Sequence, residues 1–266
     1  MSLLKSNTFR WIVAVLITLG SAVYQRMTGP TYPARGDVVF ENVTVSYKLP
    51  RSHGGEGNQP VVISVSDTSV SAQLVYRRYP TNESWTKRPM VRNNNQLMAE
   101  LPHQPPAGKI EYYLILQKNG RQHKLPEDVS VVTRFKGAVP AYILVPHILF
   151  MFLAMLLSTR TGIEALDRNS NPRKLAFWTL GFLTIGGMIL GPIVQKYAFG
   201  ALWTGVPFGW DLTDNKTLIA FLGWIGAIWA GRGGRKANIL MLGASLITLA
   251  VYLIPHSVMG SELKYE

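Results

Sequence analysis

Two histidines beside proline are the first side chains in this sequence that could do chemistry. His147 and His256 each follow a proline, and each lies within or at the end of a long apolar run. Ionisable side chains in such runs are costly to bury and are candidates for functional sites. An imidazole in this setting can bind a metal or transfer a proton. The two histidines are therefore candidate cofactor-binding residues.

A second candidate is the short connection 200–217, GALWTGVPFGWDLTDNKT, which joins two apolar runs. Trp203 and Trp210 are typical of a membrane interface, where the indole ring lies in the apolar layer and its N–H reaches water. The tryptophans therefore predict an aromatic belt at one edge of a bilayer.

The two carboxylates of this connection need a different explanation. Asp211 and Asp214 stand close to an apolar segment, where a carboxylate is costly unless it is paired or hydrated. A helix start satisfies a carboxylate through free backbone N–H groups and the helix dipole. We predict that Asp214, or the neighbouring Thr213, caps the helix that follows.

Apolar segments must hold these residues in place. A helix needs roughly 20 mostly apolar residues to cross a bilayer. The sequence predicts five spans, namely an N-terminal anchor that we expect to be retained and a four-helix transmembrane bundle, at about 11–24, 141–158, 175–194, 217–230 and 239–255. The predicted domains are the anchor, residues 1–27, an all-β domain, residues 28–138, and the four-span domain, residues 139–266.

The distribution of lysine and arginine predicts the orientation. Basic clusters lie at 5–10, 160–174 and 232–236, and five crossings place all three on one side of the membrane. Short cytoplasmic loops carry the excess of basic residues. We therefore expect a bacterial inner membrane protein with a cytoplasmic N-terminus, while the β domain and the C-terminus are periplasmic.

The predicted β domain shows alternating apolar and polar residues over 36–136. Asn119-Gly120, between two β-rich runs, is a strong signal for a hairpin with a type I′ turn. About seven short strands in roughly 100 residues predict a β-sandwich. Its histidines, His53, His103 and His123, stand singly in polar surroundings, and we predict no metal site among them.

Two stretches of this domain carry a resemblance. AQLVYRRYPTNESWTKRPM and LMAELPHQPPAGKIEYYLIL place a Trp-bearing hairpin and a Pro/Gly turn between Tyr-containing strands. This order resembles immunoglobulin-like and fibronectin type III-like domains. The resemblance implies an extracytoplasmic Ig-like sandwich that contacts other proteins or acts as a spacer.

The candidate residues of the membrane region carry a second resemblance, which covers about 20 residues. Trp203, Trp210 and Asp211 are similar to the Trp-rich "WWD" loop of haem-handling membrane proteins of cytochrome c maturation. The resemblance implies that His147 and His256 ligate a haem. Flat indole rings can stack on a porphyrin while imidazoles hold its iron.

Composition excludes several other classes of function. The chain has 266 residues, a formal net charge of +12 and no cysteine. The absence of cysteine excludes disulfides, thiolate metal sites and covalent c-type haem. No basic run is long, so we expect no nucleic-acid partner. No nucleophile, phosphate-loop or metalloprotease motif is present, which favours a protein that is not an enzyme without settling the point.

Two functions remain open. The first is a non-catalytic accessory or assembly subunit of a larger inner-membrane complex, for instance an energy-converting one, whose partners are the lipid bilayer and the other subunits. The alternative is a membrane protein that handles haem b or a quinone at its outer face. No cofactor follows from the residues alone.

Overall fold

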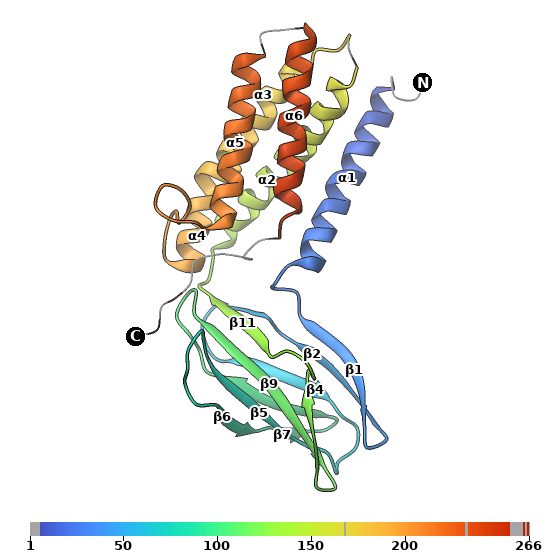
Figure 1. Ribbon diagram of the computed structural model, residues 1–266, viewed down its shortest axis with the longest axis vertical. Coiled ribbons are helices and arrows are strands. Elements are labelled where there is room, and N and C mark those ends of the chain that lie inside the picture. Colours follow the sequence, from blue (N-terminus) through green and yellow to red (C-terminus); the bar gives the residue numbers. More distant parts are fainter. Residues whose placement is uncertain (1–5, 168, 232–233, 256–262, 264, 266) are drawn as a thin grey trace. The chain divides into compact units, whose positions relative to one another are not determined.

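The computed structural model describes residues 6–167, 169–231, 234–255, 263 and 265 and separates into two compact units (Figure 1). The boundaries of the β unit are Thr31–Ala138, Ala198–Gly200 and Glu262–Glu266. The helical unit consists of the rest, Met1–Pro30, Val139–Tyr197 and Ala201–Ser261. The N-terminal helix therefore belongs to the same compact unit as the later helices.

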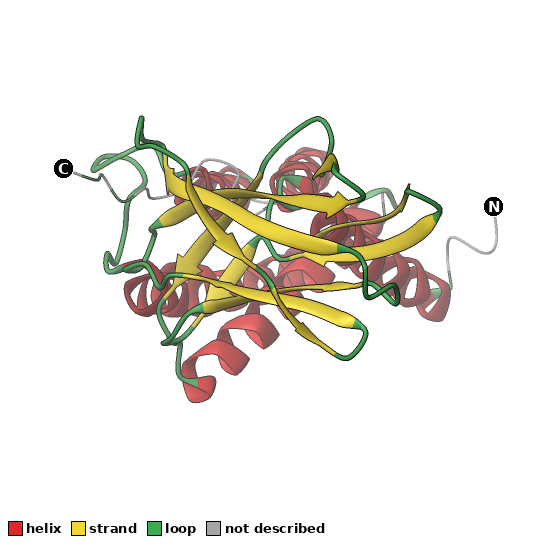
Figure 2. Ribbon diagram, turned by 90° about the horizontal axis from the view of Figure 1, so that it is seen from below, coloured by secondary structure: helices red, strands yellow, loops and turns green. Residues whose placement is uncertain are grey.

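The strands of the β unit form two sheets (Figures 1 and 2). The five-stranded sheet has the order β1-β2-β4-β8-β7, with bounds Ala34–Phe40, Val43–Leu49, Gln59–Ser64, Gln96–Leu101 and Val91–Asn93. The six-stranded sheet has the order β3-β11-β9-β5-β6, with bounds Ser52–Gly54, Val131–Lys136, Lys109–Lys118, Ser71–Tyr79 and Thr86–Pro89. Its sixth strand, β10 (Arg121–Leu125), pairs with β9.

Both sheets contribute side chains to one apolar core. In β9 every second residue is buried, including Tyr112 and Leu114, and in β4 Val61 and Ile63 are buried in the same cluster. Period-two burial is the pattern of a sheet with one face on a core. The mixed architecture of helices and β-sheets is thus confirmed, although the strands outnumber the predicted seven because several are very short.

Two tight hairpins have similar backbone geometry and different sequence signals. At the predicted β9–β10 turn, Asn119 and Gly120 have φ angles of 51° and 75°. Positive φ at both central residues is the requirement of a type I′ turn, so this prediction is confirmed. Glu41 and Asn42, with φ angles of 50° and 62°, form a second such turn between β1 and β2. Because this turn contains no glycine, the sequence predicts a single alternating strand across Glu41 and Asn42 and gives no signal for the turn.

A charged residue organises the loop after β4. The Asp67 carboxylate accepts hydrogen bonds from the Ser69 hydroxyl at 2.6 Å, the Lys118 amine at 2.9 Å and the Ser69 backbone N–H at 2.8 Å. These bonds, the Ser69 hydroxyl foremost, hold the pKa of Asp67 well below its ordinary value. The folded state therefore favours the ionised form.

We expect Asp67→Asn to flatten the acid dependence of β-unit stability. A depressed pKa stabilises the fold above the unfolded-state pKa, near 3.9, and this contribution is lost as the pH falls below that value. The melting temperature of the variant should be lower than that of wild type at pH 7, and the difference should shrink below about pH 4. Melts of the full-length protein from pH 7 to pH 3 measure this. A difference that stays constant across the range contradicts the assignment.

The helices of the second unit fall at each predicted span. Their bounds are α1 (Asn7–Thr28), α2 (Ala141–Ala165), α3 (Arg173–Leu183), α4 (Gly191–Phe199), α5 (Leu212–Ala230) and α6 (Gly234–Leu253). A π-helical segment, Thr184–Leu190, joins α3 to α4. Within the unit α1 lies against α2 and α6, and α5 packs along α6 and α3 (Figure 1).

Four helices of the described chain are long and apolar enough to cross a membrane, which fits a membrane protein. They are α1, α2, the continuous rod Arg173–Phe199 and α6. The helix α5 is not among them, although its segment is one of the predicted spans. Its first turns carry Asp214 and Lys216, which lower the mean hydropathy of a 19-residue helix.

The four glycines of the third predicted span, Gly181, Gly186, Gly187 and Gly191, predict close helix packing, and Gly186 and Gly187 show it. A Cβ atom on Gly186 would lie 2.9 Å from the Cβ of Phe150, and one on Gly187 would lie 2.7 Å from the Cγ2 of Thr217. Both separations are shorter than carbon atoms tolerate. The π-helical segment can therefore approach α2 and α5 only because these side chains are absent.

Candidate functional site

The helical unit contains a cavity among α1, α2, α5 and α6. Its volume is about 170 Å³. The helix α2 contributes the apolar side chains of Ile148, Met151, Phe152 and Met155, while α1 contributes mainly polar ones, Thr18, Ser21 and Gln25. The ionisable lining residues are His147, Lys216 and Tyr252. An ionisable group against an apolar cavity is the kind of arrangement that marks a binding site within a bundle.

His147 is oriented by the π-helical segment. Its Nδ1 atom lies 2.9 Å from the carbonyl oxygen of Gly186, which also accepts from the backbone N–H of Gly191. A carbonyl oxygen only accepts, so the proton of this hydrogen bond belongs to His147 Nδ1. The neutral ring then has its lone pair on Nε2.

Lys216 and Gln25 bind the C-terminal end of α6. Lys216 Nζ donates to the carbonyl oxygen of Ile254 at 2.6 Å, and Gln25 Nε2 donates to that of Tyr252 at 2.6 Å. The last carbonyls of a helix lack partners within the helix and carry the negative end of its dipole. These two side chains therefore fasten α5 and α1 to the same end of α6.

Asp214 organises the Trp-rich connection from within the first turn of α5. Its carboxylate Oδ2 accepts from the backbone N–H groups of Thr204 at 2.6 Å and Gly205 at 3.0 Å. Only about 6% of Asp214 is exposed. A Cβ on Gly205 would lie 2.6 Å from the Cβ of Asp214, so this close approach requires glycine. The carboxylate is satisfied by the loop that folds over it.

The prediction that Asp214 or Thr213 caps α5 is wrong, because Asp211 is the N-cap. Asp211 has extended backbone, with φ −56° and ψ 118°, and its Oδ1 accepts from the N–H of Thr213 at 2.8 Å. Its other carboxylate oxygen lies 3.1 Å from the Thr204 hydroxyl. Asp214 is already inside the helix, and the loop N–H groups of Thr204 and Gly205 occupy its carboxylate instead.

We expect Asp211→Ala to lower the free energy of unfolding by about 0.5–2 kcal/mol, the usual cost of a lost N-cap. Asp211→Ser retains an acceptor suited to this position and should recover most of the loss. Equilibrium unfolding in detergent compares the two variants. Equal destabilisation by serine and alanine contradicts a capping role.

The remaining predicted site residues do not meet at the cavity. Trp210 is about 86% exposed, and Trp203 donates its indole N–H to the carbonyl of Val206 at 3.1 Å. Of the predicted cofactor-binding residues, only His147 is among the described residues that line the cavity. His256 lies outside the described residues. A volume of about 170 Å³ is below the roughly 300 Å³ of the smallest pockets for drug-sized molecules, so this cavity does not fit a haem.

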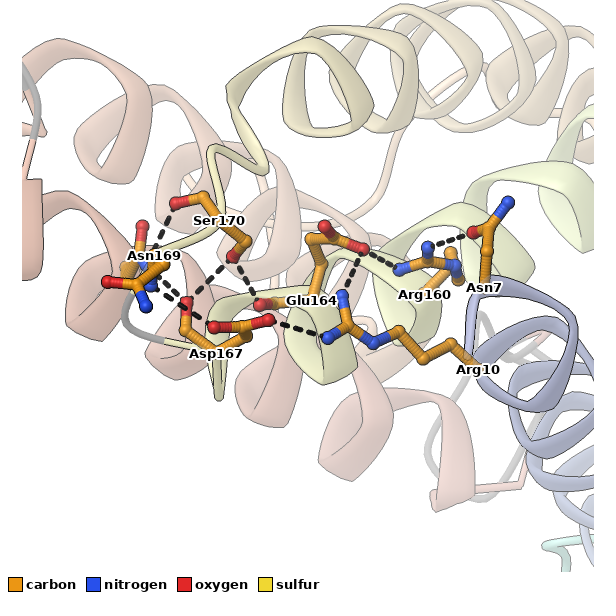
Figure 3. A network of polar contacts seen from close by, with 8 residues as sticks. Asn7, Arg10, Arg160, Glu164, Asp167, Asn169 and Ser170 are labelled. Atoms are coloured by element: carbon orange, nitrogen blue, oxygen red, sulfur yellow. Dashed lines mark hydrogen bonds and ion pairs between the residues drawn. The ribbon is translucent and has the colours of Figure 1, made fainter. Parts of the chain in front are cut away.

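An ion-pair network ties the start of α1 to the end of α2 (Figure 3). Arg10 contacts Glu164 at 3.0 Å and Asp167 at 2.7 Å, and Arg160 bonds to both Glu164 and Asn7. Arg10 and Arg160 are only 7% and 4% exposed. The two arginines counted as topology signals are thus also structural residues that hold the first helix on the bundle.

Sequence reasoning missed the partners in both polar clusters. Glu164 and Asp167 follow an apolar run closely, and their position near Arg160 is the one available signal. Lys216 in the first turns of a predicted span is an equally visible signal for a buried cation. Gln25 gave no signal, because an amide in an apolar run is uncharged.

The fold and the site define a class, a β unit joined to an apolar helical unit that contains a small His- and Lys-lined cavity. No protein-family model matches the chain, and no curated protein matches it. One similar solved structure is the Br derivative of BhCBM56, with 15% identity over 37% of this chain and 97% of that chain and a TM-score of 0.25. A similarity at that level carries no argument about function.

Proposed function

We propose that the protein is a non-catalytic accessory or assembly subunit of a larger membrane complex and that its β unit is an Ig-like contact module. Two observations support the membrane and module parts. Four helices have the length and hydropathy of membrane spans, and the two sheets share one core. The described residues contain no group of three or more His, Asp or Glu side chains that could hold a metal ion.

The observation that carries the proposal is a partly exposed face of the six-stranded sheet. Arg77 Cζ lies 4.4 Å from the centre of the Trp85 ring, and Trp85 packs edge-on against Tyr113 at 5.0 Å. Lys124 Nζ lies 5.2 Å from the Tyr113 ring. Tryptophan, tyrosine and arginine are enriched in protein interfaces, where they contribute most of the binding energy. Arg77 is held by an ion pair with Glu111 at 2.9 Å, so this face offers a partner aromatic rings together with the Lys124 ammonium.

The proposal is tested by the size of the complex in native membranes. Tagged full-length protein, produced at its native level, should migrate on a native gel in an assembly larger than itself. Trp85→Ala and Tyr113→Ala should release the partner, while Val39→Ala, an exposed position of the five-stranded sheet, should not. Circular dichroism checks that each variant is folded. Migration of the wild type alone, or retention of the partner by both folded aromatic variants, contradicts the proposal.

We further propose that α5 crosses the membrane, so that the β unit is periplasmic and the α5–α6 connection is cytoplasmic in a bacterial inner membrane. Nineteen residues in an α-helix extend roughly 28 Å, close to the thickness of the apolar layer. Arg121→Cys in the β unit should react with an impermeant reagent added to spheroplasts, and Lys236→Cys should not. Reaction at both positions contradicts a crossing by α5, and the reverse pattern contradicts the orientation.

A further inference from the structure

The cavity among α1, α2, α5 and α6 has the size of a single-ring site. An enclosed apolar cavity of about 150 Å³ accommodates benzene, and this one is about 170 Å³. Apolar side chains of α2, including Met151, Phe152 and Met155, form one part of its lining. The other helices contribute Ala22 of α1 and Val251 of α6. They also contribute polar side chains, namely those of Thr18, Ser21, Gln25 and Thr217. The space therefore suits one six-membered ring with small substituents.

Two polar side chains at the cavity have unused hydrogen-bonding capacity. His147 directs its Nδ1 proton to the Gly186 carbonyl, which leaves the Nε2 lone pair as an acceptor. Lys216 uses one N–H on the Ile254 carbonyl, and an ammonium group has three. No other hydrogen bond of either side chain is present within the described residues. One acceptor and one cationic donor thus line the same apolar space.

We propose that this cavity binds a lipid-soluble phenol, a ring whose hydroxyl group lies between His147 and Lys216. A phenolic O–H donates to an imidazole lone pair, and the same oxygen accepts from an ammonium N–H. The apolar lining holds the ring. A hydroquinone head group contains this same chemistry. The inference is independent of the proposed accessory function, because it concerns the helical unit and no protein partner.

Fluorine NMR of the full-length protein in detergent tests the site with 4-fluorophenol as the probe. We expect saturable binding that Ala22→Phe abolishes, because the added ring fills the cavity. Leu19→Phe, a matched change at an exposed position of α1, should bind like wild type. Partition of the probe into micelles is the same for all variants and cancels in the comparison.

The polar groups are tested separately from the cavity. His147→Leu and Lys216→Met should each weaken 4-fluorophenol binding about 3- to 10-fold, as expected for one lost hydrogen bond. Fluorobenzene, which lacks the hydroxyl, should bind more weakly than 4-fluorophenol to wild type and be insensitive to both substitutions. Gel filtration and circular dichroism verify that each variant is folded. Lys216→Arg keeps the positive charge and the N–H donors, so it should bind 4-fluorophenol better than Lys216→Met does. Equal binding by wild type and folded Ala22→Phe, or equal affinity for the two probes, overturns the proposal.

Discussion

Replacement of Arg10 by alanine is expected to lower the free energy of unfolding of the helical unit by about 3–5 kcal/mol. Removing one member of a buried ion pair is costly because the remaining charges lose its contact. Here Asp167 and Glu164 each lose the Arg10 guanidinium, while Glu164 keeps its contact with Arg160. Arg10 is 7% exposed and is the residue that joins Glu164 and Asp167 to the first helix. Equilibrium unfolding of the full-length protein in detergent measures the loss.

Two controls distinguish the loss of the Arg10 ion pairs from the loss of a positive charge alone. Arg235→Ala removes an exposed arginine of the same unit and should be within about 0.5 kcal/mol of wild type. Asp167→Ala combined with Arg10→Ala should cost less than the two single losses added together, because the residues share one interaction. Additive losses in this cycle, or a loss below about 1 kcal/mol for Arg10→Ala, would show that the contact behaves as a surface salt bridge.

Asp214→Ala is expected to be the second large loss, about 2–4 kcal/mol of unfolding free energy. The substitution leaves the backbone N–H groups of the half-buried Thr204 and the buried Gly205 without their shared acceptor. A hydrogen bond to a charged group contributes about 1.5–3 kcal/mol, more than a helix cap. The Trp-rich connection should then lose its fixed position over the start of α5.

A comparison of the two carboxylates makes this prediction specific. Asp214→Ala should lower the free energy of unfolding more than Asp211→Ala does. If Asp214 acted only as the helix cap, its loss would cost no more than an ordinary N-cap. Limited proteolysis should cut the connection 201–210 faster in Asp214→Ala than in wild type, since the loop N–H groups are released. A silent Asp214→Ala, with unchanged proteolysis, contradicts the role of its carboxylate in organising the loop.

Several features follow from the sequence because their causes are local. Asn119-Gly120 predicts a hairpin, since only residues that tolerate positive φ suit a type I′ turn. Apolar runs of near-membrane length predict the helices, and four of the five predicted spans meet the requirements of length and hydropathy. Glycines on one segment predict close helix packing, which Gly186 and Gly187 show. Each of these signals is contained in one continuous stretch of the sequence.

The candidate site depends on contacts between distant parts of the chain, which only the tertiary structure decides. Arg10 donates a hydrogen bond to Asp167, which is 157 residues away in the sequence. The Nδ1 atom of His147 hydrogen-bonds to a carbonyl of the π-helical segment, 39 residues away. Asp211 and Asp214 are both acceptors near a helix start, and their roles differ because the loop folds back onto only one of them at two backbone N–H groups. Residue type determines what a carboxylate or an imidazole can bind, whereas the packing of helices determines which partner lies within hydrogen-bonding distance.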